Sequence, residues 1–323
     1  MNFESRIDLQ DLNEAVAAIK AEIGKIVVGQ HQTIELLLTA ILADGHVLIE
    51  GVPGVAKTLT AKLLARTINT HFSRIQFTPD LMPSDVLGTS VFSPKLTDFV
   101  FKKGPIFSNI VLVDEINRAP AKTQAALFEV MEERQVTVDG TTYPMSLPFM
   151  VLATQNPVEH EGTYRLPEAQ LDRFLFKILV QYPTADQEVD ILRGHHQRFN
   201  MTDAIAGIVA VLSAEQLTSL REKTRQVHVE DKLLEYIAQV IAQTRTNKSL
   251  FLGASPRASV ALLNSSKALA AIRGRDFITP EDVQELAPVV LRHRIVLTPE
   301  REMEGITPDD IVTQILQKVE VPR

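Results

Sequence analysis

The loop GVPGVAKT, residues 51–58, constrains the fold of this chain more than any other segment. It follows a short apolar segment at residues 46–50 and leads into the amphipathic sequence LTAKLLARTI, so this order predicts a strand, a tight loop and a helix. The loop nearly fits the pattern GxxxxGK[ST], in which backbone amides bind phosphates, the lysine reaches the outer phosphates and the hydroxyl holds magnesium. A strand-to-helix turn with a lysine present by chance is the alternative, and the flanking strand and helix weigh against it.

Ala56 departs from this pattern, because it stands where the last glycine of the motif is expected. A β-carbon is tolerated at that position when the residue has a negative φ as the helix begins. We therefore expect a negative φ at Ala56, with its amide still directed at a phosphate. The loop residues predicted to bind the nucleotide are Gly51, Val52, Pro53, Gly54, Val55, Ala56, Lys57, Thr58 and Leu59, and Thr58 is also a predicted metal ligand.

The rest of the first half alternates between short apolar segments and helical patterns. Further strands are expected at residues 72–77, 110–113 and 149–154, with helices between them such as 120–134. This alternation predicts an α/β fold with a parallel, doubly wound sheet. Two more helical patterns, at residues 9–26 and 30–43, precede the first strand.

Two segments do not fit a minimal version of that fold. Residues 86–103 alternate like a small hairpin, and residues 135–145 contain Asp139-Gly140 between alternating flanks, which is a strong hairpin turn signal. Insertions of this kind usually project from the sheet, where they are available to partners.

The second half of the chain has a different character. Strand candidates end near residue 183, and helix starts follow at Thr184 with Gln187, at Ser213 with Gln216, and before the prolines at positions 256, 280 and 308. The length of 323 residues fits two domains at roughly 150 residues each. We expect an α/β core at residues 1–183 and a helical domain at residues 184–323.

Composition excludes several classes of function. The absence of cysteine excludes disulfides, thiolate zinc sites and a cysteine nucleophile. The 33 basic and 40 acidic side chains give a net charge of −7, which argues against a surface built to neutralise nucleic acid. No signal peptide pattern and no apolar run of roughly 18 residues is present, so we expect a cytoplasmic protein without a membrane span. The adjacent His195 and His196 point to different faces of a helix, which argues against a metal site.

Polar residues follow two of the predicted strands. Asp114 and Glu115 end the strand at 110–113, where the carboxyl ends of parallel strands form the ligand site of open α/β sheets. Asp114 is suited to bind magnesium directly or through water, and Glu115 to orient an attacking water. Asn156 follows the strand at 149–154 and could hydrogen-bond that water or the outer phosphate. The alternatives are an acidic helix cap and, for Asn156, a polar turn residue before a proline.

Two arginines could complete such a site. Arg173 is expected at the end of a short helix, and Arg257 in the first turn of the helix that Ser255-Pro256 begins. An arginine stabilises the charge that develops on a transferring phosphate, either in its own subunit or in a neighbour. Taken singly, each is better explained by a surface or interdomain ion pair, but their order after the preceding motifs favours a catalytic role.

The motifs together resemble one known family, the AAA+ ATPases, and within them the MoxR family. The resemblance covers nearly the whole chain, and alanine before the loop lysine is usual in that family. The segments that carry it are VGQ (28–30), GVPGVAKT (51–58), QFTPDLMPSDVLG (76–88), VDEINRAPAKTQAALFEVMEERQVTVDG (113–140), ATQNPVEHEGTYRLPEAQLDRF (153–174), GASPRAS (253–259) and GRDFITPEDV (274–283).

The resemblance implies a P-loop NTPase core with a parallel five-stranded sheet, a helix-2 insert at 86–103, a pre-sensor-1 insert at 135–147, and an all-α lid domain. It also implies a role for single residues. These are Lys57 and Thr58 as the Walker A pair, Asp114 and Glu115 as the Walker B pair, Asn156 as sensor 1, Arg173 as a finger for a neighbouring subunit, Arg257 as sensor 2 in the lid, and Val28 and Gly29 beside the adenine.

The function that the resemblance implies is ATP hydrolysis with Mg²⁺ in a ring, typically a hexamer, with the nucleotide between the core and the lid. Its work would be chaperone-like remodelling or maturation of client proteins, with von Willebrand A domain partners and, in some members, insertion of a metal cofactor. Two alternatives stay open. One is a nucleotide-gated binding module with little turnover, and the other is a motor acting on nucleic acid, which the acidic charge disfavours.

Overall fold

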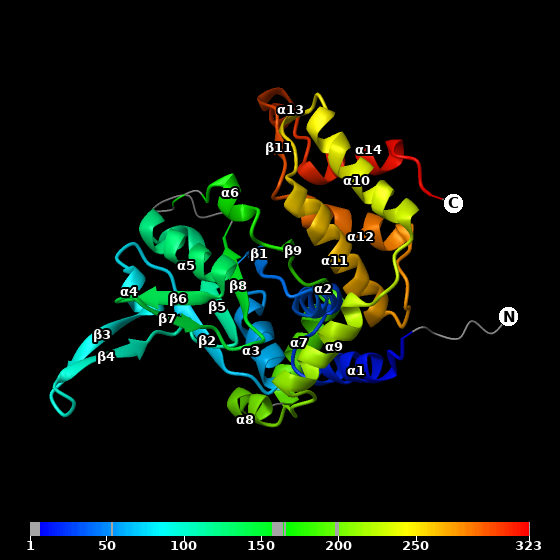
Figure 1. Ribbon diagram of the computed structural model, residues 1–323. Coiled ribbons are helices and arrows are strands. Elements are labelled where there is room, and N and C mark those ends of the chain that lie inside the picture. The colour runs from blue at the N-terminus through cyan, green and yellow to red at the C-terminus, as the bar shows by residue number, and fades with distance from the viewer. Residues whose placement is uncertain (1–6, 53, 157–163, 165, 198–199, 323) are drawn as a thin grey trace.

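The computed structural model describes residues 7–52, 54–156, 164, 166–197 and 200–322. Its N-terminal part forms an α/β core, and a bundle of helices from the C-terminal part lies beside this core (Figure 1). The expected fold class is therefore confirmed. The exact boundary between core and helical domain, which we expect near residue 183, stays a prediction, because the packing of the two parts is continuous in one apolar cluster.

A parallel sheet of five strands, in the order β2-β5-β8-β1-β9, forms the centre of the described core. Four of these strands are predicted within one residue at each end. The fifth, β9, was missed by the residue pattern because Phe174 and Leu175 lead into it without a turn residue. The strands are β1 (Val47–Gly51), β2 (Phe72–Gln76), β5 (Ile110–Asp114), β8 (Met150–Gln155) and β9 (Phe176–Val180).

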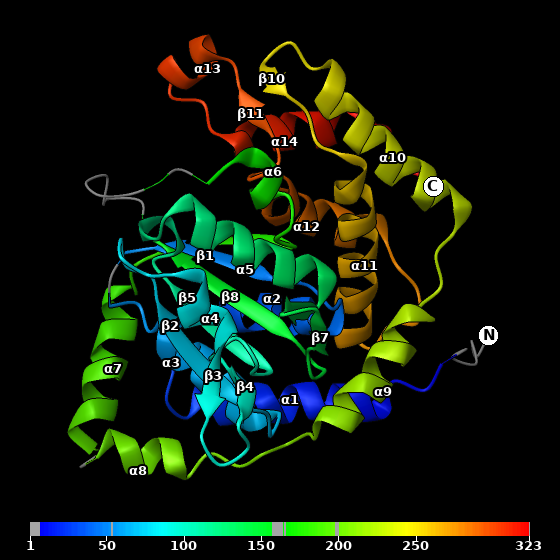
Figure 2. The same ribbon diagram turned by 60° about the vertical axis from the view of Figure 1, so that its left-hand side comes forward.

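Both faces of the sheet are covered by helices. In β5, Ile110 and Leu112 pack into one apolar cluster, and Val111 and Val113 pack into another on the opposite face. Burial on both faces explains why the strand sequences read as continuous apolar runs. The first face carries α1 (Gln10–Gly24), α2 (His31–Leu42) and α3 (Lys57–Thr67), and the second carries α5 (Ala121–Glu133), as Figure 2 shows.

The two expected hairpins are present, and they project from the core on the side away from the C-terminal bundle (Figure 1). Asp139 and Gly140 have φ values of 49° and 76°, as a two-residue hairpin turn requires. Phe101 stacks on Tyr143 at 4.5 Å between ring centroids, so the two hairpins support each other. The elements are α4 (Pro83–Leu87), β3 (Gly88–Ser93) and β4 (Asp98–Lys103), then β6 (Gln135–Val138) and β7 (Thr141–Pro144).

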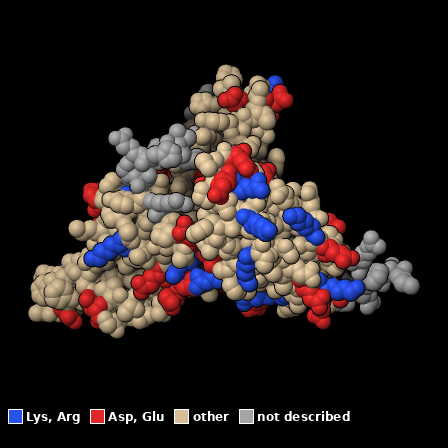
Figure 3. All heavy atoms as spheres, turned by 90° about the horizontal axis from the view of Figure 1, so that it is seen from above, with Lys and Arg blue, Asp and Glu red and all other residues tan. Residues whose placement is uncertain are grey.

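The outer part of the first hairpin is apolar. It forms the left end of the molecule in Figure 3, where the surface is largely uncharged, whereas basic and acidic side chains are interspersed over the rest of that view. Of the two phenylalanines in β4, Phe101 packs against the second hairpin, whereas Phe99 is 67% exposed. The exposed apolar side chains of this hairpin are Val91, Phe92, Leu96, Phe99 and Val100.

The second half is mainly helical, as expected. The predicted helix starts are confirmed by side-chain caps, for example at Ser213 with Gln216 and at Thr307 with Asp310. No helix in the described part of the chain is long and apolar enough to cross a membrane. The helices are α7 (Ala185–Gln197), α8 (Met201–Ala206), α9 (Ala214–Arg225), α10 (Asp231–Thr246), α11 (Pro256–Ile272), α12 (Pro280–Leu291), α13 (Pro299–Met303) and α14 (Pro308–Lys318).

The expectation that this half is all-α is wrong in one detail. β10 (Leu250–Leu252) and β11 (Val296–Leu297) form a small antiparallel pair that joins the loop after α10 to the segment after α12. Strands of three and two residues are too short to produce an alternating pattern, which is why the sequence shows no sign of them.

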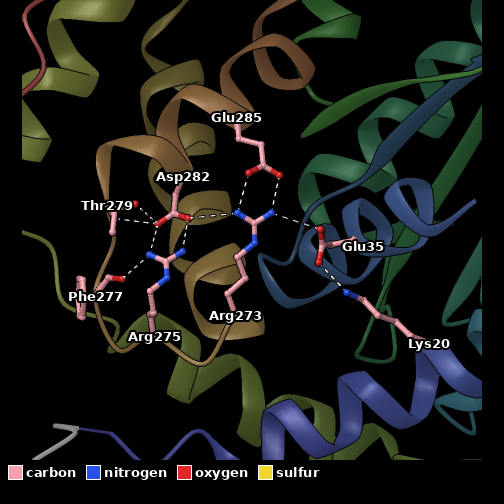
Figure 4. A network of polar contacts seen from close by, with 8 residues as sticks. All are labelled: Lys20, Glu35, Arg273, Arg275, Phe277, Thr279, Asp282 and Glu285. Carbon is pink, nitrogen blue, oxygen red and sulfur yellow. Dashed lines mark hydrogen bonds and ion pairs between the residues drawn. The ribbon is translucent and has the colours of Figure 1, made fainter.

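A network of ion pairs fastens the C-terminal bundle to the N-terminal helices (Figure 4). Arg273, which follows α11, binds Glu285 of α12 with two hydrogen bonds of 2.7 Å and lies 3.6 Å from Glu35 of α2. Glu35 also pairs with Lys20 of α1 at 2.7 Å. Residues from three different parts of the chain therefore meet at the C-terminal end of α11.

Candidate active site

The glycine loop borders a pocket of about 490 Å³ at the carboxyl end of β1. Two parts of its wall are the segment that carries Val28 and Gly29 and the helix α7, which adjoin at Gly29 and Gln187. The loop itself contributes Gly54, Val55 and Ala56 to the lining. The remaining lining residues are Ile26, Val27, Gln30, Gln32, Thr33, Leu59, Leu179, Val180, Gln181, Tyr182, Pro183, Thr184, Gln187, Ile191, His195 and Met201.

The pocket lies between the predicted core and the first helices of the predicted helical region at 184–323. Among the described residues, none from α10 to α14 lines it, so the placement of the nucleotide between the core and the lid stays a prediction. The sequence pattern missed Tyr182, Ile191 and His195. Their signal was weak, because α7 reads as an ordinary exposed amphipathic helix and nothing in its residues announces which face meets a ligand.

Gly29 lies where its segment meets α7. Its φ is 76°, and a β-carbon built there would lie 2.4 Å from Cδ of Gln187, at the far end of a flexible side chain. Gln187 can turn away from such a β-carbon, whereas the left-handed backbone favours glycine itself. The backbone conformation at position 29 is therefore the reason for glycine in this wall.

The expectation of a negative φ at Ala56 is wrong. Ala56 has φ 58° and ψ 20°, which is the left-handed region, and Gly54 before it has φ 86°. The loop must turn from the end of β1 into the first residue of α3 within a few positions, and left-handed residues provide that curvature. The curvature that the loop requires thus outweighs the preference of alanine for a negative φ. Pro53, which was predicted to bind nucleotide, lies outside the described residues.

Two side chains brace the loop. The Lys57 ammonium donates a hydrogen bond of 2.6 Å to the carbonyl of Gly51, at the opposite end of the loop. The Gln30 amide donates to the carbonyl of Val55. Lys57 is the first residue of α3, and Thr58 is the second, so both lie at a helix N-terminus, where the dipole favours bound anions.

The two carboxylates stand at the carboxyl end of the interior strand β5, as predicted: Asp114 is its last residue and Glu115 follows it. Asp114 accepts a hydrogen bond from the Thr154 hydroxyl of β8, and its other oxygen accepts two from Arg74 of β2, at 2.6 Å and 3.1 Å. Asp114 therefore already binds one cationic group, the guanidinium of Arg74. Its oxygens and the hydroxyl of Thr58 are the ligand type that Mg²⁺ prefers, so the donor set fits a magnesium ion.

Glu115 has a left-handed backbone, with φ 56°, which turns its side chain away from the strand. Its backbone amide donates to the Thr154 hydroxyl at 3.0 Å. Its carboxylate accepts a hydrogen bond of 3.0 Å from the Gln76 amide and forms an ion pair of 3.2 Å with Arg118. Gln76 and Arg118 were not predicted, since nothing in the sequence shows which residues of a neighbouring strand face a carboxylate.

Asn156 follows directly after β8. Glu50 of β1 pairs with Gln155 of β8, so Asn156 continues at the level of Gly51, where the glycine loop begins. Its side chain is almost buried. The structure therefore brings Asn156 to the same edge of the sheet as the loop and the two carboxylates.

Arg173 lies at the opposite edge. It precedes β9 by three residues, and the first residue of β9, Phe176, pairs with the first residue of β1, Val47. The glycine loop follows the last residue of β1, so the two sites are separated by the length of the strands, roughly 15 Å for five residues. The guanidinium of Arg173 donates to the carbonyl of Phe128 at 2.8 Å.

Arg257 lies beside Arg173. Both arginines contact the carboxylate of Glu132 near the end of α5, Arg257 at 2.8 Å and Arg173 at 3.5 Å. Arg257 does not line the pocket. The structure therefore groups the two arginines with each other and separates both from the glycine loop of the same chain.

Among the described residues, no group of three or more histidine and acidic side chains forms a separate metal cluster. His195 lines the pocket wall, which gives it a place that the sequence did not predict.

Comparison with known proteins matches both halves to family models. Residues 46–176 match the model described as "ATPase family associated with various cellular activities (AAA)", and residues 242–315 match that of an "AAA lid domain". A solved structure from Cytophaga hutchinsonii, whose description names an ATPase, is similar with a TM-score of 0.90. It is 43% identical, and the match covers 97% of each chain.

Whole-chain relatives are also found. The protein "Chaperone MoxR1" of Mycobacterium tuberculosis is 46% identical over 94% of this chain and 81% of its own length. The uncharacterized protein YeaC of Bacillus subtilis is 46% identical, and "Protein MoxR" of Methylorubrum extorquens is 31% identical. Each of these two matches covers 97% of both chains.

Proposed function

Because this chain belongs to the MoxR family of AAA+ ATPases, we propose that it hydrolyses ATP, with Mg²⁺, at sites completed between neighbouring subunits of a ring. The observation that carries this proposal is the placement of Arg173 and Arg257 at the sheet edge opposite the glycine loop. Neither can serve the loop of its own chain without crossing the sheet. A second copy that places this edge against the pocket would supply them to its neighbour's nucleotide.

The remaining residues then have assigned tasks. The adenine and ribose occupy the pocket between the Val28-Gly29 wall and α7, and the phosphates lie on the amides of the loop and the N-terminus of α3. Lys57 leaves the carbonyl of Gly51 to contact the outer phosphates. Thr58 and Asp114 would hold the magnesium ion, which would supply neutralisation of the charge on the phosphates.

Glu115 orients the water that attacks the terminal phosphate, and Gln76 and Arg118 hold its carboxylate. Asn156 binds that water or the outer phosphate from β8. Arg173 of the neighbour stabilises the charge that develops on the transferring group, and Arg257, in the region matched by the lid model, assists it.

The proposed work is chaperone-like remodelling or maturation of a client protein in the cytoplasm, by a ring that we take to be a hexamer. A von Willebrand A domain partner and metal cofactor insertion are part of the proposal as the MoxR resemblance implies them. The apolar end of the β3–β4 hairpin, with Phe92 and Phe99 exposed, supports a surface for protein contacts. Nucleic acid is the less favoured partner, given the net charge of −7.

The test is ATP turnover per protomer as a function of protein concentration, with magnesium and without any partner. A site shared between subunits predicts a steep rise as the ring assembles, tracked by sizing at the same concentrations. Glu115→Gln should abolish this turnover while leaving ATP binding intact. If assembled wild-type protein binds ATP but shows no turnover at any concentration, the nucleotide-gated binding module becomes the better account.

A further inference from the structure

The loop that carries Arg173 is held by a residue from the C-terminal bundle. Arg294, between α12 and β11, is almost fully buried, and its guanidinium donates to three backbone carbonyls on both sides of Arg173. The acceptors and distances are Asp172 at 3.2 Å, Phe174 at 2.6 Å and Leu175 at 3.0 Å. The backbone on either side of the finger is therefore fixed by one side chain.

Asp172 completes the connection. One oxygen of its carboxylate accepts a hydrogen bond of 2.9 Å from Nε of Arg294, and the other accepts one of 2.7 Å from the hydroxyl of Ser255. Ser255 is the N-cap of α11, the helix that bears Arg257 in its first turn. Two segments of the bundle, at Ser255 and at Arg294, thus bind Asp172, the residue before Arg173.

His293 adds a second donor on the same loop. Its Nε2 lies 2.9 Å from the carbonyl of Phe174, and burial lowers its pKa well below the ordinary value, so the ring is neutral and donates. Phe174 is buried with its ring edge against Phe128, whose carbonyl accepts from Arg173. The direction of the Arg173 side chain and the position of its backbone therefore both depend on the packing of Phe174 against Phe128.

A buried arginine is costly unless its hydrogen bonds are satisfied. Burial lowers the pKa of Arg294 to about 10, and its guanidinium donates to one carboxylate and four carbonyls, including that of Val290 on α12. A packed apolar side chain would fill this space without that cost. A buried guanidinium at position 294 is explained if its role is to fix the backbone of residues 172–175.

We propose that Arg294 is the positioning residue of the Arg173 finger, and that it makes the lid and the finger of one subunit move as a unit. This inference rests on the proposed shared site and names the contact that would couple the two. The N-cap of α11, Ser255, is hydrogen-bonded to Asp172, and Arg273 after its last turn lies in an ion pair with Glu35. A displacement of the lid would therefore also displace Arg173 in the neighbouring site. Binding of a client to the lid would then change hydrolysis in the adjacent subunit.

The test compares Arg294→Met with Arg292→Met. Arg292 is a matched control, because it is also a largely buried arginine, but it pairs with Asp309 and the carbonyl of Lys177 and does not contact the finger loop. For Arg294→Met we expect kcat to fall about tenfold or more, up to the 10³–10⁵ that a supplied arginine is worth as a whole, with the KM for ATP unchanged. Arg292→Met should retain kcat.

Two further readouts separate positioning from general stability. Arg294→Met should add no loss of kcat to Arg173→Ala, and mixing it with Lys57→Ala subunits, whose fingers are intact, should restore turnover in mixed rings. Asp172→Asn, which keeps the side-chain shape, serves as the second variant if Arg294→Met fails to fold, and should show the same fall in kcat.

The outcomes are distinct. If Arg173→Ala alone turns over ATP normally, the shared site of the proposed function fails. If Arg173→Ala is slow, but Arg294→Met and Asp172→Asn behave like Arg292→Met, the shared site stands and the positioning role of Arg294 is overturned.

Discussion

The side-chain amide of Gln76 donates a hydrogen bond of 3.0 Å to the carboxylate of Glu115, across neighbouring strands β2 and β5. Gln76 pairs in register with Asp114, the residue before Glu115, so the contact is set by the sheet and not by a flexible loop. The guanidinium of Arg74, two residues earlier, binds both the Gln76 side chain and Asp114. One edge strand therefore orders both carboxylates of the site.

Replacement of Gln76 by leucine should lower ATP turnover about tenfold, because Glu115 loses one of the two donors that hold it, and a positioned base contributes 10²–10⁴ to a rate. ATP binding should not change, since Gln76 does not line the pocket. Steady-state kinetics and nucleotide titration measure the two effects. Gln284→Leu, which loses a hydrogen bond to Tyr236 in the C-terminal bundle, is the control. Unchanged kcat in Gln76→Leu would show that Arg118 alone suffices.

Replacement of Arg74 by glutamine should lower the magnesium concentration that half-saturates nucleotide binding, because the guanidinium occupies an oxygen of Asp114. Exposed ion pairs are worth ~0.2–1 kcal/mol, so the shift should be about 1.4- to fivefold. Fluorescent nucleotide binding at varied magnesium measures it without hydrolysis. Arg301→Gln, which breaks the exposed pair with Glu304, should leave it unchanged. A higher magnesium requirement in Arg74→Gln would mean that the arginine supports the metal site.

Replacement of Ala56 by glycine should raise the free energy of unfolding of the nucleotide-free protein by about 1 kcal/mol, since the left-handed backbone costs alanine roughly 1–2 kcal/mol. Ala61→Gly, inside α3 and buried, should lower the same quantity by about 1 kcal/mol or more. Urea unfolding compares the two variants. Equal destabilisation by both would contradict a strained Ala56.

Acidification should destabilise the core through His46. Its Nδ1 accepts from the Val151 amide at 3.0 Å, its Nε2 donates to the Met131 carbonyl at 3.1 Å, and burial lowers its pKa from 6.5 to about 4. Between these two values the unfolded chain binds more protons than the folded one, so the stability present above pH 6.5 is lost as the pH falls toward 4. The total loss is roughly 3 kcal/mol for one such group.

Unfolding free energies at pH 7, 6 and 5 measure this dependence. His46→Asn should be less stable than the wild type at pH 7 but should lose less stability on acidification, because one titrating group is gone. His293, which is also buried with a lowered pKa, contributes with the same sign and remains in both proteins. Parallel pH profiles for the two proteins would assign the acid sensitivity elsewhere.

Much of the fold could be read from the sequence, because apolar runs, turn residues and helix caps act locally. The strand before the glycine loop, the turn at Asp139 and the cap at Ser213 all stand within a few residues of their signals. β9 and the β10–β11 pair could not be read, since their pairing partners lie far away in the chain and their own residues carry no turn or alternation.

The site was predictable where a motif gives both the residue and its place, as for Lys57 and Asp114. It was not predictable where a long-range contact decides the role. Gln76 faces Glu115 because of strand register, α7 lines the pocket because it packs beside the segment of Val28 and Gly29, and Arg257 joins Arg173 through Glu132. The φ of Ala56 also lay beyond sequence reasoning, because loop curvature outweighs the preference of one residue.

The most direct measurement of the central claim is ATP turnover by a mixture of Lys57→Ala and Arg173→Ala subunits. Lys57→Ala should bind no ATP, and Arg173→Ala should bind ATP but hydrolyse it ~10³-fold more slowly or worse. In mixed rings, an intact finger from one variant meets an intact pocket in the other, so turnover should rise well above that of either variant alone. Turnover equal to the average of the two separate proteins, in rings shown to exchange subunits, would contradict a site shared between neighbours.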